Sequence, residues 1–136
     1  MMRIELAGDT IDEICYAIAR LVDGPSRRDV KAGYLILYES ETARGDPIAT
    51  MSLSRPAFGP IKNGAMTANR IEDGFATREG KIRWAEICDA SKKVVFGCDV
   101  GEKDATIKIN EIEIKANAPV IVNSLTIRMP KRKISN

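Results

Sequence analysis

Residues 81–98 read KIRWAEICDASKKVVFGC, and this stretch decides the fold class. Apolar and polar side chains alternate over 81–88, which is the period of an extended strand. The polar connection 89–92 has the length of a hairpin turn, and the alternation resumes over 93–98. The segment therefore predicts two antiparallel strands joined by a hairpin.

The same pattern continues over most of the chain after residue 32. Short apolar segments are separated by turns rich in Gly, Pro, Asn and Asp, which is typical of an all-β protein. The further segments are 33–38, 48–53, 65–71, 105–115 and 120–129. In the last two the apolar phase slips by one residue, at Asn110-Glu111 and at Asn123-Ser124, so a turn or bulge is expected at each place. We predict an all-β, antiparallel β-sandwich of jelly-roll type with roughly seven to nine strands.

One amphipathic helix is expected before the strands, over about residues 10–23. Thr10-Ile11-Asp12-Glu13 has the form of a capping box, and Gly24-Pro25 gives a stop signal. The apolar stripe consists of Ile11, Ile14, Ile18, Leu21 and Val22. A single helix on a β domain must lie on the sheet, plug an open end or pack on a partner. We predict one domain over residues 1–130, followed by a basic tail at 131–136.

The chain has no histidine and three cysteines. Without His it lacks the commonest general base and metal ligand, and no Ser-His-Asp or Cys-His pair is possible. The odd number of cysteines argues against a disulfide framework, and Cys15, Cys88 and Cys98 lack zinc-site spacing. An even hairpin sets Cys88 beside Lys93 and Cys98 beside Arg83, so those two sulfurs do not meet. We expect free thiols, no metal, no cofactor and no enzymatic activity.

The net charge is +2, and much of it lies in a terminal cluster of Lys131, Arg132 and Lys133. A cluster this small is a weak footprint for nucleic acid, so a solvated tail is favoured over direct nucleic-acid binding. The apolar runs are too short to span a bilayer, and the start of the chain has no signal-peptide core. Synthesis in a cytosol, without a membrane partner, is the expectation.

The aromatic residues leave an alternative open. Trp84, Tyr34, Tyr38 and Phe96 could together line the sugar platform of a carbohydrate-binding module. Aromatic side chains on alternating strands are more often part of the core, so the core position is favoured. The acidic residues are spread along the chain, and nothing selects a pair for glycosidase chemistry.

Several short motifs follow one another between about residue 10 and residue 130. They are LVDG at 21–24, LILY at 35–38, IATMSLSRPAFG at 48–59, NGAMTAN at 63–69, Trp84, Asp89 and NSLTI at 123–127 before Pro130. In their order and spacing they resemble a family of small virion structural proteins of tailed bacteriophages and prophages. The chain departs from that pattern in its charged segments at 27–31 and 92–93 and in its basic tail.

The resemblance implies a non-enzymatic particle protein, and within it we expect a capsid decoration, or cement, protein on the outside of the phage head. Its partner would be the major capsid protein of the same phage, bound by a dimer or trimer of this chain, in a virion made in the bacterial host cytoplasm. A neck, collar or tail-fibre component is the alternative in the same setting. From loop exposure and charge, the expected contact residues are Arg27, Arg28, Lys31, Arg55, Phe58, Lys62, Asn63, Lys131, Arg132 and Lys133. Phe58 is also expected to pin its loop to the body.

Overall fold

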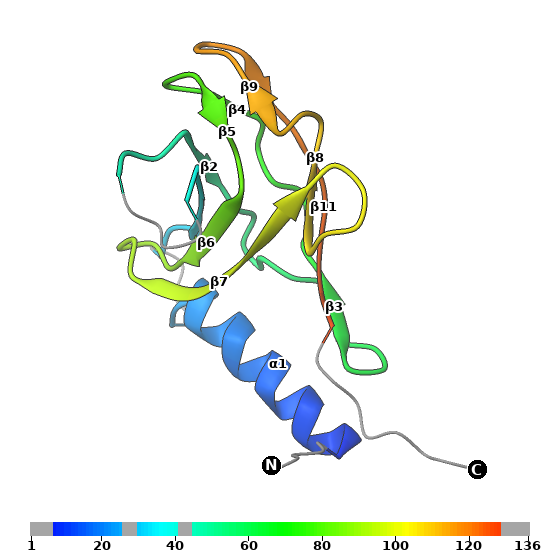
Figure 1. The fold of residues 1–136 in the computed structure, drawn as a ribbon. Coiled ribbons are helices and arrows are strands. Elements are labelled where there is room, and N and C mark those ends of the chain that lie inside the picture. Colours follow the sequence, from blue (N-terminus) through cyan, green and yellow to red (C-terminus); the bar gives the residue numbers. More distant parts are fainter. Residues whose placement is uncertain (1–6, 26–29, 41–44, 129–136) are drawn as a thin grey trace, which may run out of the picture.

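The computed structural model describes residues 7–25, 30–40 and 45–128, and in these ranges one helix precedes eleven short strands (Figure 1). The predicted β-rich class is therefore confirmed. The strands outnumber the prediction because several turns and connections contain strands of only two residues. The elements are α1 (Gly8–Asp23), β1 (Tyr34–Tyr38), β2 (Ala49–Ser52), β3 (Ala65–Thr67), β4 (Gly74–Phe75), β5 (Gly80–Lys81), β6 (Trp84–Cys88), β7 (Val94–Gly101), β8 (Ile107–Ile109), β9 (Glu113–Ile114), β10 (Pro119–Val120) and β11 (Val122–Arg128).

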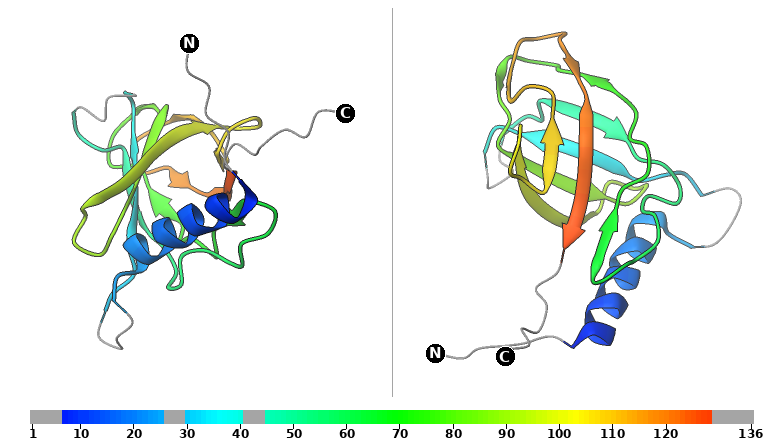
Figure 2. Two further views of the ribbon diagram at one scale, coloured as in Figure 1. Left: turned by 90° about the horizontal axis from the view of Figure 1, so that it is seen from below. Right: turned by 90° about the vertical axis from the view of Figure 1, so that its right-hand side faces the viewer.

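Seven of the strands form one sheet in the order β2-β1-β6-β7-β8-β11-β3. Two ribbons, β10-β4 and β5-β9, complete the strand pairing of the described residues. The long sheet curls around on itself, as the views in Figures 1 and 2 show. The jelly-roll sandwich is not confirmed, because the strand order describes one curled sheet with two small ribbons.

The sheet is mixed, so the prediction of a purely antiparallel sheet is wrong at one place. β7 and β8 run parallel, pairing Val100 with Ile107 and Gly101 with Lys108. Parallel strands usually need a long crossover, but here the short loop 102–106 suffices because so few residues pair. Asp99 holds that loop, since its carboxylate accepts hydrogen bonds from the Thr106 hydroxyl at 2.7 Å and from the Thr106 amide at 3.3 Å.

The hydrophobic core lies inside the curl of the sheet. Leu35 and Leu37 of β1 point into it opposite Ile87 and Ala85 of β6. The facing wall comes from β8 and β11, which contribute Ile107, Ile109, Leu125 and Ile127. The same alternation leaves the other face of β1 and β6 outside the core.

Both predicted phase slips are present. The chain breaks between β8 and β9 at residues 110–112, and the pairing of β11 with β8 shifts register between Val122 and Ser124. The breaks let Ile107, Ile109 and Ile114 all be buried, with Ile112 packed against the core from a half-buried position.

The hairpin between β6 and β7 is confirmed, but its register differs from the even one predicted. A bulge beside Cys88 places Val94 opposite that residue and Cys98 opposite Ala85. The two sulfurs still do not meet. All three cysteines are free, with Cys15 and Cys88 buried and Cys98 half-buried.

Helix α1 begins earlier than predicted. Ala7 is the N-cap, no side chain caps the helix, and the Ile11 amide donates to the Ala7 carbonyl at 3.0 Å. The predicted capping box of Thr10 and Glu13 is therefore wrong, because Thr10 already lies inside the first turn. The predicted stop is confirmed, since Gly24 follows the last helical residue and donates its N–H to the Arg20 carbonyl at 2.9 Å.

The helix lies across one open end of the curled sheet, against β3 and β7 (Figure 2). Ile11, Cys15 and Val22 are buried there, and Ile18 packs beside them. Leu21 is 62% exposed, so its predicted place in the apolar stripe is wrong. Neighbouring helix positions differ by about 100° in direction, and burial of Val22 turns Leu21 outward.

Candidate interaction surface

The predicted contact residues lie in separate parts of the molecule. Lys31, Arg55, Lys62 and Asn63 are exposed, whereas Phe58 is buried. The remaining predicted contacts, Arg27, Arg28, Lys131, Arg132 and Lys133, fall outside the described residues. The contact role of the exposed residues stays a prediction, and their structural surroundings differ.

Arg55 holds the C-terminal end of α1. Its Nε donates to the Asp23 carbonyl at 3.0 Å, and its Nη2 donates to the Pro25 carbonyl at 2.6 Å. The Ala57 amide donates to Asp23 Oδ1 at 2.9 Å, so the loop and the helix end are joined on both sides. A cation at a helix C-terminus also offsets the partial negative charge of the unpaired carbonyls. Much of the guanidinium is thus engaged within the chain.

Phe58 pins its loop to the body, as predicted. The side chain is 6% exposed and belongs to the core, and the backbone bridges antiparallel to Ala68. A ring buried this far has little surface to offer a partner, so Phe58 serves the fold.

Lys62 and Asn63 form the start of a tight hairpin that leads into β3. Lys62 and Ala65 exchange both backbone hydrogen bonds, at 2.9 and 3.0 Å. Between them Asn63 and Gly64 have φ angles of 51° and 73°, the left-handed pair of a type I′ turn. The Asn-Gly pair is a strong hairpin signal, but above it was noted only as part of the motif at 63–69.

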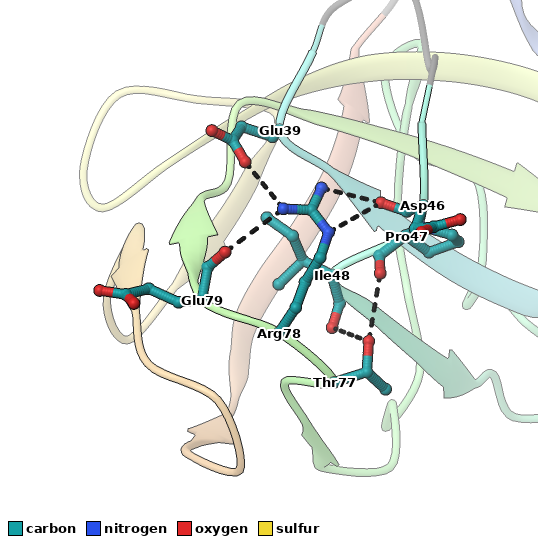
Figure 3. A network of polar contacts seen from close by, with 7 residues as sticks. All are labelled: Glu39, Asp46, Pro47, Ile48, Thr77, Arg78 and Glu79. Atoms are coloured by element: carbon teal, nitrogen blue, oxygen red, sulfur yellow. Dashed lines mark hydrogen bonds and ion pairs between the residues drawn. The ribbon is translucent and has the colours of Figure 1, made fainter.

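A polar network on the surface joins the segment before β2 to the segment before β5 (Figure 3). Arg78 forms an ion pair with Glu39 at 2.9 Å and donates from Nη2 and Nε to the Asp46 carbonyl at 2.9 and 3.2 Å. The Thr77 hydroxyl lies within hydrogen-bond distance of the Pro47 and Ile48 carbonyls, at 3.2 and 3.1 Å. Exposed ion pairs stabilise little, so these contacts chiefly fix the path of the backbone.

Aromatic residues gather on the face of β1 and β6 that points away from the core. We call Tyr34, Ile36, Tyr38, Trp84 and Glu86 the outer aromatic face. Tyr38 lies directly opposite Trp84, and Ile36 lies opposite Glu86. Ile36 is only 8% exposed although it lies outside the main cluster of core residues, so its neighbours on this outer face cover it. The side chains form one continuous surface across two strands.

The predicted core position of the aromatic residues is confirmed only for Phe96. Phe96 lies opposite the buried Ile87 and packs against the core. Trp84 is half-buried on the other face. Alternation separates the two faces of a strand, but it does not say which one turns inward when both carry large apolar side chains.

Trp84 lies on Gly97 of the adjacent strand. A Cβ atom at Gly97 would stand 2.7, 2.8 and 2.9 Å from Cζ2, Nε1 and Cε2 of the indole. Cε2 joins the other two atoms and is the farthest of the three, so the indole approaches the glycine with the edge that carries its N–H. The indole therefore occupies the space that a side chain at position 97 would need.

Charged side chains contact the two tyrosines of the outer aromatic face: Glu86 contacts Tyr38, and Lys92 contacts Tyr34. Burial, the charge of Glu86 and a hydrogen bond to Glu86 raise the pKa of the Tyr38 phenol. At the other end of the face, the Lys92 ammonium lies 5.2 Å from the centre of the Tyr34 ring, in a cation–π contact. The phenol beside Glu86 thus stays protonated and able to donate at neutral pH.

A second surface lies at the far end of the curled sheet from α1. Phe75 and Ile121 are 66% and 37% exposed, and Pro119 pairs with Phe75 in the β10-β4 ribbon. We call Phe75, Pro119 and Ile121 the apolar tip. Asn110 fixes its backbone, since Nδ2 donates to the Pro119 carbonyl at 3.2 Å and Oδ1 accepts from the Ile121 amide at 3.0 Å. None of these three residues was predicted as a contact, because Phe75 and Pro119 lie outside the predicted strands and Ile121 lies between Val120 and Val122 in the predicted strand 120–129.

The thiols are poor nucleophiles at neutral pH. Burial, with the charges of nearby acids, raises the pKa of Cys88 to about 11 and that of Cys98 to about 12. Burial also raises the pKa of Cys15. In the described residues, no group of three or more His, Cys, Asp or Glu side chains is arranged to hold a metal ion.

None of the helices in the ranges that the structure describes has the length and apolar character needed to cross a membrane. Comparisons of this chain with protein-family models, with curated proteins and with solved structures found no match.

Proposed function

We propose that this chain is a capsid decoration, or cement, protein of a tailed bacteriophage, which binds the outer surface of the assembled head. The ordered motifs between residues 10 and 130 support the choice of family. In the structure, the observation that carries the proposal is the apolar tip, where large apolar side chains stand exposed on a fixed backbone. Exposed apolar patches on a small protein mark interaction sites, and aromatic residues at their centre supply much of the binding energy.

The proposed mechanism is mass action. A ligand that binds only the assembled shell stabilises it by about 2.7 kcal/mol per site when its free concentration is 100 times the dissociation constant. A dimer or trimer of the chain on neighbouring capsid subunits would add the contacts of its copies. This role requires no catalysis, no cofactor and no direct contact with nucleic acid.

The experiment mixes the purified chain with phage head shells that lack it, counts the bound copies and measures the melting temperature of the shells. We expect saturable binding to the outer surface and a higher melting temperature. The variant Phe75→Ser should bind at least tenfold more weakly, and Leu21→Ser, an exposed apolar residue on α1, is the matched control. The variant Lys62→Glu tests the predicted contact at the hairpin.

Failure of the folded chain to bind such shells would contradict the decoration role. A stoichiometry of about six or twelve copies per particle would instead favour the neck or collar. If Phe75→Ser binds as the unaltered chain does, the apolar tip is not the contact surface.

A further inference from the structure

We propose that the outer face of β3 and β11 carries a binding site for a phosphomonoester dianion, held between Lys62 and Arg128. This inference goes beyond the proposed role in the shell, because β3 lies at the opposite end of the molecule from β4 and the apolar tip (Figure 1). It is carried by the pairing of the strands, by the charges that line the hollow there and by the donors that these side chains leave unused.

The first observation is the strand pairing, which brings the two cations to one place. Ala65, at the start of β3, lies opposite Arg128 of β11, and on its other side it exchanges both backbone hydrogen bonds with Lys62. Residues directly opposite one another point to the same face of a sheet. Because Met66 is buried, that face is the outer one, and Lys62 and Arg128 flank Ala65 on it. The short side chain of Ala65 leaves the space between the two cations open.

The second observation is an open hollow at this place, of about 370 Å³. Both cations line it, together with Thr67 and Thr126, and none of the ten residues that line it is acidic. Among the described residues, the side chains of Lys62 and Arg128 have no ion-pair or hydrogen-bond partner. Both charges are therefore available to a ligand in the hollow.

The third observation is a pair of hydroxyls in the next row of the same face. Thr67 lies opposite Thr126, and their hydroxyl oxygens are 3.2 Å apart. One hydroxyl donates to the other in this contact, so the second keeps its own O–H for a ligand. A hydroxyl, an ammonium and a guanidinium thus offer donors on one surface, and a guanidinium can bind a phosphate through two parallel hydrogen bonds.

The surrounding charges also favour an anion. The strands β3, β8 and β11 contain no acidic residue, and Lys108 of β8 lies on the same outer face, opposite Ser124. Asp99 brings a negative charge to the border of this face, where its carboxylate accepts from the Thr106 hydroxyl at 2.7 Å. The cations of the three strands outnumber this carboxylate, so an anion is attracted to the face.

The class of anion follows from the number of charges and donors. A phosphomonoester carries about −1.5 to −2 charges at neutral pH and three strong acceptor oxygens. Two cations balance that charge, and the threonine hydroxyl supplies a donor beyond those of the cations. A carboxylate has one charge and two oxygens, and it would leave part of this set unused.

The experiment titrates the whole chain, labelled with ¹⁵N, and follows the backbone amide signals by NMR at neutral pH. The probes are inorganic phosphate, glycerol phosphate and acetate, each added at constant ionic strength. We expect saturable shifts with both phosphates, largest at residues 62–67 and 126–128. Acetate should bind at least about fivefold more weakly, because it makes fewer charge-assisted hydrogen bonds.

Three variants test the geometry. Lys62→Gln and Arg128→Gln each remove one charge, and each should weaken phosphate binding at least about fivefold. Ala65→Leu keeps both charges but fills the space between them, and it should weaken binding to a similar extent. The matched control is Lys115→Gln, which removes an exposed cation next to β9, far from β3 (Figure 1). The amide spectra show whether each variant is folded, and Thr67→Val provides a second test if Ala65→Leu does not fold.

The proposal is overturned if inorganic phosphate gives no saturable shifts, or if acetate binds as tightly as phosphate. It is also overturned if Arg128→Gln and Ala65→Leu both bind phosphate as the unaltered chain does. An oligothymidylate, which carries only phosphodiesters, is titrated as well, and its binding without phosphate binding would mark a nucleic-acid surface and contradict the proposal. Arg128 is not among the predicted shell contacts, so its variant separates phosphate binding from binding to the shell.

Discussion

Gly24 is the residue on which the end of α1 depends. Its φ of 73° and ψ of −166° lie in a region that is essentially restricted to glycine, and a Cβ there would also meet the Val30 side chain at 3.3 Å. We predict that Gly24→Ala lowers the free energy of unfolding by about 1–3 kcal/mol, measured by urea denaturation. Gly8→Ala, at an open helical position, should be neutral or slightly stabilising. Equal effects of the two substitutions would contradict this role for Gly24.

Asp89 organises the turn between β6 and β7. Its carboxylate accepts hydrogen bonds from the Lys93 amide at 2.9 Å and from the Ser91 hydroxyl and amide at 2.8 and 3.0 Å. These bonds, with that from Lys93 the largest cause, lower the pKa of Asp89 in the folded state. A lowered pKa in the folded state means that the ionised carboxylate stabilises the fold above its unfolded pKa, about 3.9.

The pH dependence of stability follows from that sign. We predict that Asp89→Asn is less stable than the unaltered chain at pH 6, and that the difference shrinks as the pH falls from about 5 to about 3. Thermal unfolding of both proteins across this range measures it. A difference that stays constant with pH would show that the charge of Asp89 contributes nothing to the turn.

At the scale of elements, α1 is attached through one face only. Ile11 is fully buried against the sheet, whereas Leu21 on the same helix is 62% exposed. We predict that Ile11→Ala lowers the free energy of unfolding by about 2–5 kcal/mol, and that Leu21→Ala changes it by less than about 0.5 kcal/mol. Chemical denaturation of the two variants makes the comparison, and similar losses would mean that the helix is seated differently.

Elements with a local signal were predictable from the sequence. The turn at residues 89–92, the helix stop at Gly24 and the phase slips in the last strands each rest on a few neighbouring residues. The start of α1 was not predictable in the same way, because no side chain caps the helix and its first three residues, 8–10, are exposed and leave no apolar pattern in the sequence.

Across the whole molecule, strand periodicity predicted a β protein but not how the sheet closes. A period of two residues is the same in a sandwich and in a curled sheet, and it does not distinguish parallel from antiparallel neighbours. Between the parallel strands β7 and β8, Asp99 binds Thr106 across a loop, and no pattern in either strand indicates that contact.

The candidate surfaces were predictable only in part. Charge and loop composition pointed to Arg55 and Lys62, but Arg55 is largely occupied by the helix end. The apolar tip and the outer aromatic face arise when residues distant in sequence become neighbours, such as Phe75 with Pro119 and Tyr38 with Trp84. Such surfaces require the pairing of strands to be known.

The curled sheet also brings the start of α1 and the end of β11 to the same end of the molecule. The first residue of α1 and the last residue of β11 lie near β3, at the opposite end from β4 with its apolar tip (Figure 1). An affinity handle attached at the first residue of α1 or at the last residue of β11 would therefore stand at the end of the molecule away from Phe75. In both cases the end that carries Phe75 would stay accessible to a binding partner in solution.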